Sequence, residues 1–376
     1  MRSTSEGVTR VILLRHGAST FNVEGRYQGC CDESVLTQEG RTAAWLSGKR
    51  LSSEGIAAVI SSPLQRAAET AHEVRSIFQE SRQGVSFETD VRLREVELTA
   101  WEGLPYNRVK QEFPAQLTAW RLHPSDLRMP SPSEEDAFPV RNLYRRIESF
   151  WTDLLAAYTG KSVLLVTHGG TARAMVTSAL GLGIDYFQRF QQSNCGISCL
   201  SVPLTTGCAK LELLNDTAHL SKALPKLKQG RTGVRLLLIT ADSDDAEDYL
   251  DLSCILERVA IDQTLILSPT RPAALSVFGG HSGTQQVAEA WLERNLKDIL
   301  ETATGKMLSQ AALVAPADFV RQFLERYLGL PRTTRRFLDV SGSAVTAIHW
   351  PGNGAPAVLQ GMNLFERKTH LTGGQV

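Results

Sequence analysis

Short apolar runs alternate with longer amphipathic stretches along the first half of the chain. The runs have strand length and β-rich composition, and helical patterns follow most of them. Such alternation is typical of βαβ units, so we expect an α/β fold with a mostly parallel central sheet and helices on both faces. The expected strands are 11–14, 57–61, 163–167, 196–202 and 211–214, and the expected helices are 37–51, 63–78, 140–158 and 171–180.

Two segments of the first half lack this periodicity. Residues 18–22 are expected to form a loop at the rim of a pocket. Between residues 105 and 139, prolines punctuate the chain and 131–136 is polar and acidic. Long loops inside compact domains are usually functional. We therefore interpret about 101–140 as an insertion that forms a lid over a site.

The composition of the chain mainly excludes classes of protein and of binding partner. The 376 residues, 42% hydrophobic and 21% charged, are typical of a globular protein with room for two domains. Forty basic and forty acidic residues cancel, which disfavours nucleic acid and anionic membranes as partners. No apolar run reaches transmembrane length, and the polar N-terminus has no signal-peptide core. Six cysteines show neither a disulfide framework nor zinc-site spacing. We expect a cytoplasmic protein without a bound metal.

Candidate chemistry gathers where the strands end. Arg15 and His16 end the first run, Arg66 lies in the first turn of the helix after the second run, and His168 ends the third. The carboxyl ends of neighbouring parallel strands meet at one edge of a sheet, so these side chains should converge. A neutral imidazole can be a nucleophile, and guanidinium groups bind phosphate through paired, charged hydrogen bonds. The pattern predicts phosphoryl transfer through histidine, with Gly17 giving the backbone freedom to turn towards a bound group.

Four motifs, in this order and spacing, resemble the histidine phosphatase superfamily, also called the phosphoglycerate mutase-like family, over about residues 8–215. The motifs are Leu14-Arg15-His16-Gly17 with Asn22, Ser61-Ser62-Pro63-Leu64-Gln65-Arg66-Ala67, Leu93-Arg94-Glu95 through Trp101-Glu102-Gly103, and Val166-Thr167-His168-Gly169-Gly170.

The resemblance implies a role for each motif residue. His16 would be the nucleophile that becomes phosphohistidine, and Glu95 would protonate the leaving oxygen and later activate water. The phosphate pocket would be formed by Arg15, Arg66 and His168, with Asn22 and Gln28 lining it. The resemblance also implies that no metal or cofactor takes part.

Three functions remain open at this point. The leading expectation is a phosphomonoesterase that acts on a small phosphorylated metabolite. The alternatives are a phosphoglycerate mutase dependent on 2,3-bisphosphoglycerate and a non-catalytic phosphometabolite sensor. Mutases of this family carry an Arg-His-Tyr-Gly type run beside the acid, whereas this chain has Val96-Glu97-Leu98-Thr99, which favours hydrolysis. Glu97 is a second candidate for the acid, and motif position favours Glu95.

The second half looks like a worn repeat of the first. Runs at 234–242, 265–274, 305–316 and 344–350 parallel the strand-end segments and the strand at 196–202. In this alignment Arg15, His16, Arg66 and His168 are replaced by Thr240, Ala241, Pro272 and Pro316. We expect a catalytic domain at 1–220, a linker at 221–232 and a degenerate, inactive phosphatase-like domain at 233–376.

The resemblance also bears on substrate. The two-domain arrangement is similar to members from photosynthetic lineages that act on phosphoserine or on sugar-acid phosphates such as 2-carboxyarabinitol 1-phosphate. The motif residues do not choose between these substrates. A homodimer is compatible with the sequence.

Overall fold

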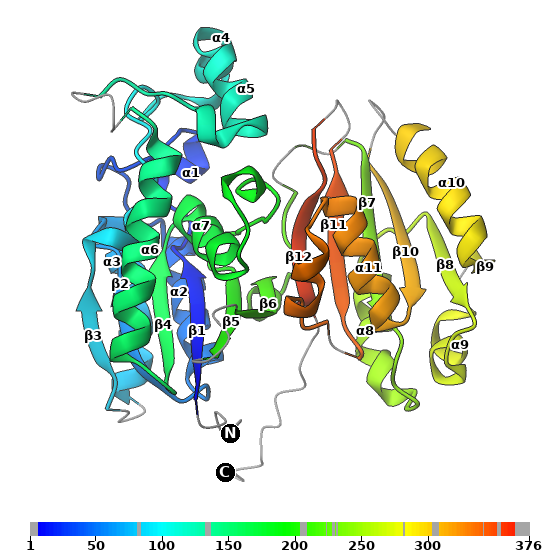
Figure 1. The fold of residues 1–376 in the computed structure, drawn as a ribbon. Helices are drawn as coiled ribbons and strands as arrows, with labels where there is room; N and C mark the ends of the chain where they lie inside the picture. The colour runs from blue at the N-terminus through cyan, green and yellow to red at the C-terminus, as the bar shows by residue number, and fades with distance from the viewer. Residues whose placement is uncertain are drawn as a thin grey trace.

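A twelve-stranded sheet runs through the whole molecule, in the order β3-β2-β4-β1-β5-β6-β12-β11-β7-β10-β8-β9 (Figure 1). The computed structural model describes residues 7–80, 84–131, 137–203, 209–222, 224–227, 230, 232–280, 283–302, 308–340, 342–351 and 355–364. The strands of the first half are β1 (Val8–Arg15), β2 (Ile56–Ser61), β3 (Ser86–Thr89), β4 (Ser162–Thr167), β5 (Ile197–Pro203) and β6 (Lys210–Asp216).

The pairing within the first half explains why the candidate residues meet. Strands β3, β2, β4 and β1 are neighbours in this order and all run parallel, with Arg15 opposite Thr167 and Ser61 opposite Val166. Strands β5 and β6 continue the sheet in antiparallel pairing. The carboxyl ends of β1, β2 and β4 therefore lie at one edge, as the alternation of elements predicted.

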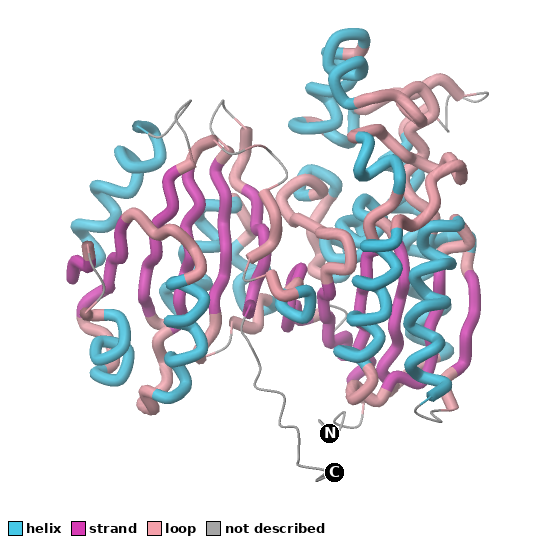
Figure 2. Tube along the Cα trace, turned by 180° about the vertical axis from the view of Figure 1, so that it is seen from behind, coloured by secondary structure: helices cyan, strands magenta, loops and turns pink. Residues whose placement is uncertain are grey.

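Successive side chains of β1 point to opposite faces of the sheet, and each face is covered by its own helices. Ile12 and Leu14 pack with α2 (Gln38–Leu51) and α3 (Gln65–Glu80). Val11 and Leu13 belong to a larger core with α6 (Pro139–Ala157) and α7 (Gly169–Ala179). The expected mostly parallel sheet with helices on both faces is confirmed, and the view from behind shows the second helical layer (Figure 2).

The second half repeats this topology. Its strands lie in the order β12-β11-β7-β10-β8-β9, which matches β6-β5-β1-β4-β2-β3 position by position and in parallel or antiparallel sense. Along the strand direction, the helices that follow β7 and β8 lie at the bottom of the view in Figure 1, whereas α4 (Tyr106–Glu112) and α5 (Pro114–Leu122) of the first half lie at the top. The elements are β7 (Val234–Thr240), α8 (Glu247–Glu257), β8 (Gln263–Ser268), α9 (Pro272–Phe278), β9 (Thr284–Ala288), α10 (Glu289–Thr302), β10 (Ser309–Ala315), α11 (Ala317–Leu328), β11 (Val345–Trp350) and β12 (Val358–Leu364).

Several elements differ from the expectation. A short helix, α1 (Thr20–Glu24), stands where a loop was expected. Helix α3 starts at Gln65, two residues after the expected Pro63. The lid segment contains two helices, α4 (Tyr106–Glu112) and α5 (Pro114–Leu122). With seven and nine residues, these helices are too short to display a helical period. In the sequence, the proline at the start of each helix suggests an interruption of regular structure, although proline is also common in a first helical turn. Residues 132–136 of the lid and parts of the expected linker, at 223, 228, 229 and 231, lie outside the described residues.

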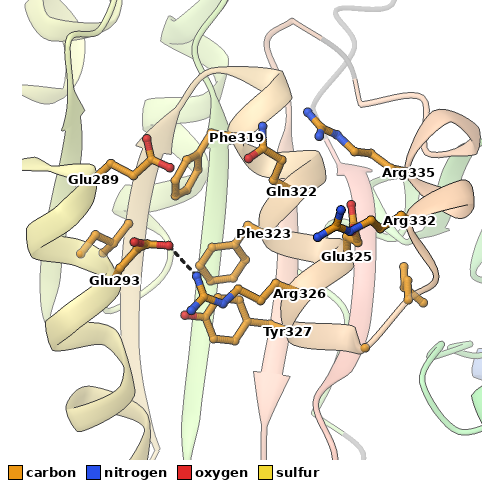
Figure 3. A pocket seen from close by; sticks show the side chains of 13 residues that line it. Glu289, Glu293, Phe319, Gln322, Phe323, Glu325, Arg326, Tyr327, Arg332 and Arg335 are labelled. Carbon is orange, nitrogen blue, oxygen red and sulfur yellow. Dashed lines mark hydrogen bonds and ion pairs between the residues drawn. The ribbon is translucent and has the colours of Figure 1, made fainter.

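A groove of about 700 Å³ lies in the second half between α10 and α11 (Figure 3). Phe319 and Phe323 form its apolar floor, and the ion pair between Arg326 and Glu293, with 2.6 Å between Nη1 and Oε1, crosses it. The strand-end residues expected to bind phosphate do not line it. Among the described helices, none combines the length and apolar character needed to cross a membrane.

Candidate active site

Two buried imidazoles lie side by side at the ends of β1 and β4. The backbone N–H of His16 donates to the carbonyl of Thr167 at 2.8 Å, which fixes the end of β1 beside the residue before His168. The ring centroids of His16 and His168 are 5.2 Å apart. Both side chains are almost fully excluded from solvent. The strand pairing thus brings together two histidines 152 positions apart in the chain.

One hydrogen bond sets the tautomer of His16. Its Nδ1 lies 2.8 Å from the carbonyl oxygen of Gly17. A carbonyl can only accept, so Nδ1 carries a proton, and in the neutral ring the lone pair resides on Nε2. Nε2 is therefore the nitrogen able to act as a nucleophile.

A close contact between two backbone segments requires glycine at position 17. A Cβ at this position would lie 2.5 Å from the carbonyl oxygen of Gly40, at the start of α2. Gly17 lets α2 pack directly against the loop that carries His16.

Arg66 is a fully buried guanidinium at the start of α3. It donates from Nη1 to the carbonyl of Cys31 at 2.9 Å and from Nη2 to the carbonyl of Gly29 at 2.8 Å. Its Nε has no hydrogen-bond partner among the described residues. Burial lowers the pKa of Arg66, partly offset by Glu95, which means that its charge is costly without a nearby anion.

Arg15 has a similar environment. Its Nη1 donates to the carbonyl of Gln192 at 3.0 Å, and its buried Nε has no hydrogen-bond partner in the part of the chain that the structure describes. Burial lowers the pKa of Arg15, with Glu95 opposing this effect and Arg66 adding to it. Both guanidiniums are buried, and they lie close enough for their charges to repel each other. An anion bound between them would relieve this repulsion.

The environment of His168 disfavours the charged form of its ring. Burial, and after it repulsion from Arg66, hold the pKa of His168 well below its usual value. Its Nε2 lies 2.8 Å from the Ser62 hydroxyl, and its buried Nδ1 has no hydrogen-bond partner within the described segments. Together with Nε of Arg15 and Nε of Arg66, this makes three buried nitrogens without partners in the residues expected to bind phosphate.

Glu95 lies at the N-terminus of α7, next to His168 in the fold. Its carboxylate accepts from the backbone N–H groups of Val96 at 2.9 Å, Gly170 at 2.9 Å and Thr171 at 3.1 Å. A Cβ on Gly170 would lie 2.4 Å from Oε1, so this approach requires glycine. The competing candidate, Glu97, instead pairs with Arg94 at 3.3 Å, and its side chain is 47% exposed. Glu95 thus lies at the start of α7 beside His168, whereas Glu97 lies at the surface.

Asn22 and Gln28 are hydrogen-bonded to residues that hold the loop after His16. Oδ1 of Asn22 accepts from the Ser19 backbone N–H at 3.3 Å and from Nδ2 of Asn194 at 2.9 Å. Oε1 of Gln28 accepts from the Ser19 hydroxyl at 3.0 Å. The hydrogen bonds of these two amides within the described residues thus run to Ser19 and Asn194, which position the loop after His16.

Sequence reasoning missed the loop before β5. Gln192 supplies the carbonyl that holds Arg15, and Nδ2 of Asn194 donates to the carbonyls of His16 and Gly17, at 3.0 Å each. No motif marks this loop, because it acts partly through its backbone. The run Ser193-Asn194-Cys195-Gly196 gives a turn signal and nothing more specific.

The lid is tied to the site through Arg173 of α7. The Arg173 guanidinium lies over the rings of Trp120 and Phe187, at 5.6 and 4.5 Å from their centroids, and donates to the side chain of Gln188. Nε2 of Gln188 in turn donates to the carbonyl of Trp120, on α5. Burial lowers the pKa of Arg173 to about 10, with Glu95 opposing the shift and Arg15 adding to it.

The α/β fold, with two histidines and two arginines at its strand ends, agrees with the family that a comparison with known protein families identifies. Residues 11–217 match the Histidine phosphatase superfamily (branch 1). The chain therefore belongs to the histidine phosphatase superfamily.

Relatives from several organisms match this region. The chain is 34% identical to a probable 2-carboxy-D-arabinitol-1-phosphatase from Arabidopsis thaliana, over 65% of this chain and 49% of that protein. It is 39% identical to 2-carboxy-D-arabinitol-1-phosphatase from Triticum aestivum, over 51% and 36%. Phosphoserine phosphatase 1 from Hydrogenobacter thermophilus is 26% identical, over 57% and 96%. The chain thus spans half or less of the length of the first two relatives.

A solved structure gives the same fold. Bacillus stearothermophilus YhfR aligns with a TM-score of 0.50 and 27% identity, over 56% of this chain and 99% of that chain. The match thus accounts for about one half of this chain.

Proposed function

We propose that the first half is a phosphomonoesterase that hydrolyses a small phosphorylated metabolite through a phosphohistidine on His16. The observation that carries this proposal is the pair of buried imidazoles, 5.2 Å apart, flanked by Arg15 and Arg66, each with an Nε that lacks a partner among the described residues. Phosphoryl transfer depends on positioning and on stabilising the charge of the transferring group. The guanidiniums of Arg15 and Arg66 supply the opposing positive charge here.

The proposed reaction has two steps. Nε2 of His16 attacks phosphorus and the ester P–O bond breaks, while the Glu95 carboxylic acid gives its proton to the leaving oxygen. Water then attacks the phosphohistidine as Glu95 takes a proton from it, and the P–N bond breaks to release inorganic phosphate. Acid in the first step and base in the second are roles that one carboxyl can alternate between.

The decisive experiment is a panel of phosphorylated metabolites assayed for phosphate release, with His16→Ala as the control. We expect release by the unchanged chain and none by the variant. Release unchanged in His16→Ala would refute the mechanism. Interconversion of phosphoglycerates that requires 2,3-bisphosphoglycerate would replace hydrolysis by mutase activity, as the relatives named probable phosphoglycerate mutase make worth testing.

For the substrate, we propose a phosphate ester that also carries a carboxylate. The relatives named for 2-carboxy-D-arabinitol 1-phosphate and phosphoserine act on esters of this class. Arg173 is our candidate contact for that carboxylate, because its charge interacts with Arg15 and Glu95 and it is not among the residues expected to bind phosphate. Arg173→Met should raise KM for phosphoserine and leave KM for p-nitrophenyl phosphate unchanged; an equal rise for both would contradict a carboxylate contact.

We propose that the second half is catalytically inactive. Ala241 donates its backbone N–H to Ala315 at 2.9 Å, the same bond that His16 makes to Thr167, so a methyl group stands at the nucleophile position. The carboxylate of Asp242 accepts from the N–H of Ala317 at 3.1 Å, at the start of α11. An acidic side chain there would repel phosphate. Residual phosphatase activity in His16→Ala would count against this proposal.

A further inference from the structure

The seam between the two halves is built from pairs of equivalent contacts. Strands β6 and β12 meet in antiparallel pairing at Leu214 and Met362. Nδ2 of Asn215 donates to the carbonyl of Gln360, and Nδ2 of Asn363 donates to the carbonyl of Glu212, both at 2.6 Å. Both asparagines adopt left-handed backbone conformations, with φ of 54° and 57°. Each half therefore holds the edge strand of the other through an equivalent asparagine side chain that donates to a backbone carbonyl.

A second pair of contacts joins each edge strand to a loop of the other half. The backbone N–H of Gln191 donates to the carbonyl of Leu359 at 2.9 Å, and that of Asp339 donates to the carbonyl of Leu211 at 3.0 Å. The equivalent bridges pair Phe190 with Leu359 and Leu211 with Leu338. The seam thus has approximate two-fold symmetry within one chain.

The two loops differ in what they serve. The loop of the first half continues from Gln191 to Gln192, whose carbonyl holds Arg15, and to Asn194, which holds the backbone of His16. Leu359 also donates its own N–H to the carbonyl of Arg189 at 2.7 Å. The equivalent loop of the second half faces an end of the sheet where alanine and proline replace the histidines.

We propose that the second half is a positioning element for the active site: β12 holds the loop 189–194, and through it Arg15 and His16. This inference rests on the proposed phosphatase function. A loop without regular structure loses conformational entropy when it is ordered, and contacts with a rigid strand compensate for that loss. Displacement of a phosphate-binding group by about 1 Å can cost on the order of 100-fold in rate.

The test compares two matched core truncations in the full chain. Leu359 and Leu211 occupy equivalent positions at the seam, and both are fully buried. Leu359→Ala loosens the strand under the active-site loop, whereas Leu211→Ala loosens the strand under the opposite loop. We expect similar falls in Tm, a loss of about 10-fold or more in kcat/KM for Leu359→Ala, and a change of less than about twofold for Leu211→Ala.

Two further measurements keep the result interpretable. Calorimetric titration with inorganic phosphate should show weaker binding to Leu359→Ala than to Leu211→Ala. Gln191→Ala, which removes side-chain bonds to Lys226 and Gln360, should give the same selective loss if Leu359→Ala fails to fold.

Equal kcat/KM and equal phosphate affinity in the two leucine variants would overturn the inference and leave the phosphatase function intact. If the unchanged chain hydrolyses no ester in the panel, the proposed function fails, and the phosphate titration alone then decides whether β12 positions Arg15.

Discussion

Replacing Glu95 by glutamine separates proton donation from the structural role of this side chain. Both carboxylate oxygens accept backbone N–H groups, two at Oε1 and one at Oε2. A glutamine has one accepting oxygen, so its NH₂ group must face at least one N–H donor. A hydrogen bond to a charged group contributes about 1.5–3 kcal/mol, and we expect Glu95→Gln to lower the free energy of unfolding by that order.

The catalytic loss should be larger and selective. Loss of a general acid typically costs about 10²–10⁴-fold in rate, or about 3–5 kcal/mol in the barrier. This loss applies to alkyl phosphates, whose leaving oxygen needs a proton. The p-nitrophenolate ion leaves without one, so Glu95→Gln should hydrolyse p-nitrophenyl phosphate within about 10-fold of the unchanged chain.

The assay is kcat/KM for both esters, because this quantity covers the steps up to phosphorylation of the enzyme and excludes the later attack of water. Glu97→Gln is the matched control, since Glu97 pairs with Arg94 at the surface. Equal losses on both esters in Glu95→Gln would refute proton donation and leave a structural role. A selective loss in Glu97→Gln would show that the neighbouring carboxylate is the acid.

Further predictions concern packing, charge and pH. Gly170→Ala places a Cβ 2.4 Å from Oε1 of Glu95; the carboxylate must shift, and kcat/KM for alkyl phosphates should fall about 10-fold or more, whereas unchanged kinetics would contradict the contact. Arg66→Lys keeps a charge but loses the fork that holds two backbone carbonyls; inorganic phosphate should bind at least about 10-fold more weakly in calorimetry, and an unchanged affinity would count against the pocket. Burial lowers the pKa of His219 to about 4, so below about pH 6.5 the unfolded chain binds a proton that the folded chain does not. The free energy of unfolding should therefore fall by about 2 kcal/mol from this group between about pH 6.5 and 5. Denaturant unfolding of His219→Gln should show a shallower fall, and an identical fall would refute the assignment.

The convergence of the candidate residues could be predicted because it follows from local signals. Arg15, Arg66 and His168 each follow a short β-rich run, and parallel strands place their carboxyl ends together. The register of β1 and β4 then fixes His16 beside His168. The fold of the first half was therefore predictable from strand length and alternation, and its repetition in the second half from the parallel sequence segments.

Other features depend on contacts between distant segments, which leave no local pattern. Gly17 is required by a carbonyl of α2 rather than by its own φ. Gln192 acts through its backbone, so its side chain carries no signal. Asn194 looks like an ordinary turn residue in the sequence. The helices α4 and α5 are shorter than the window in which a helical period can be recognised.

The most direct test of the account is to trap the intermediate. The unchanged chain, mixed with a substrate from the panel and quenched within one turnover, should carry an acid-labile phosphoryl group on the peptide that contains His16, as read by mass spectrometry. His16→Ala should carry none. A phosphoryl group on any other residue, or turnover without a phosphorylated His16, would contradict the proposed chemistry.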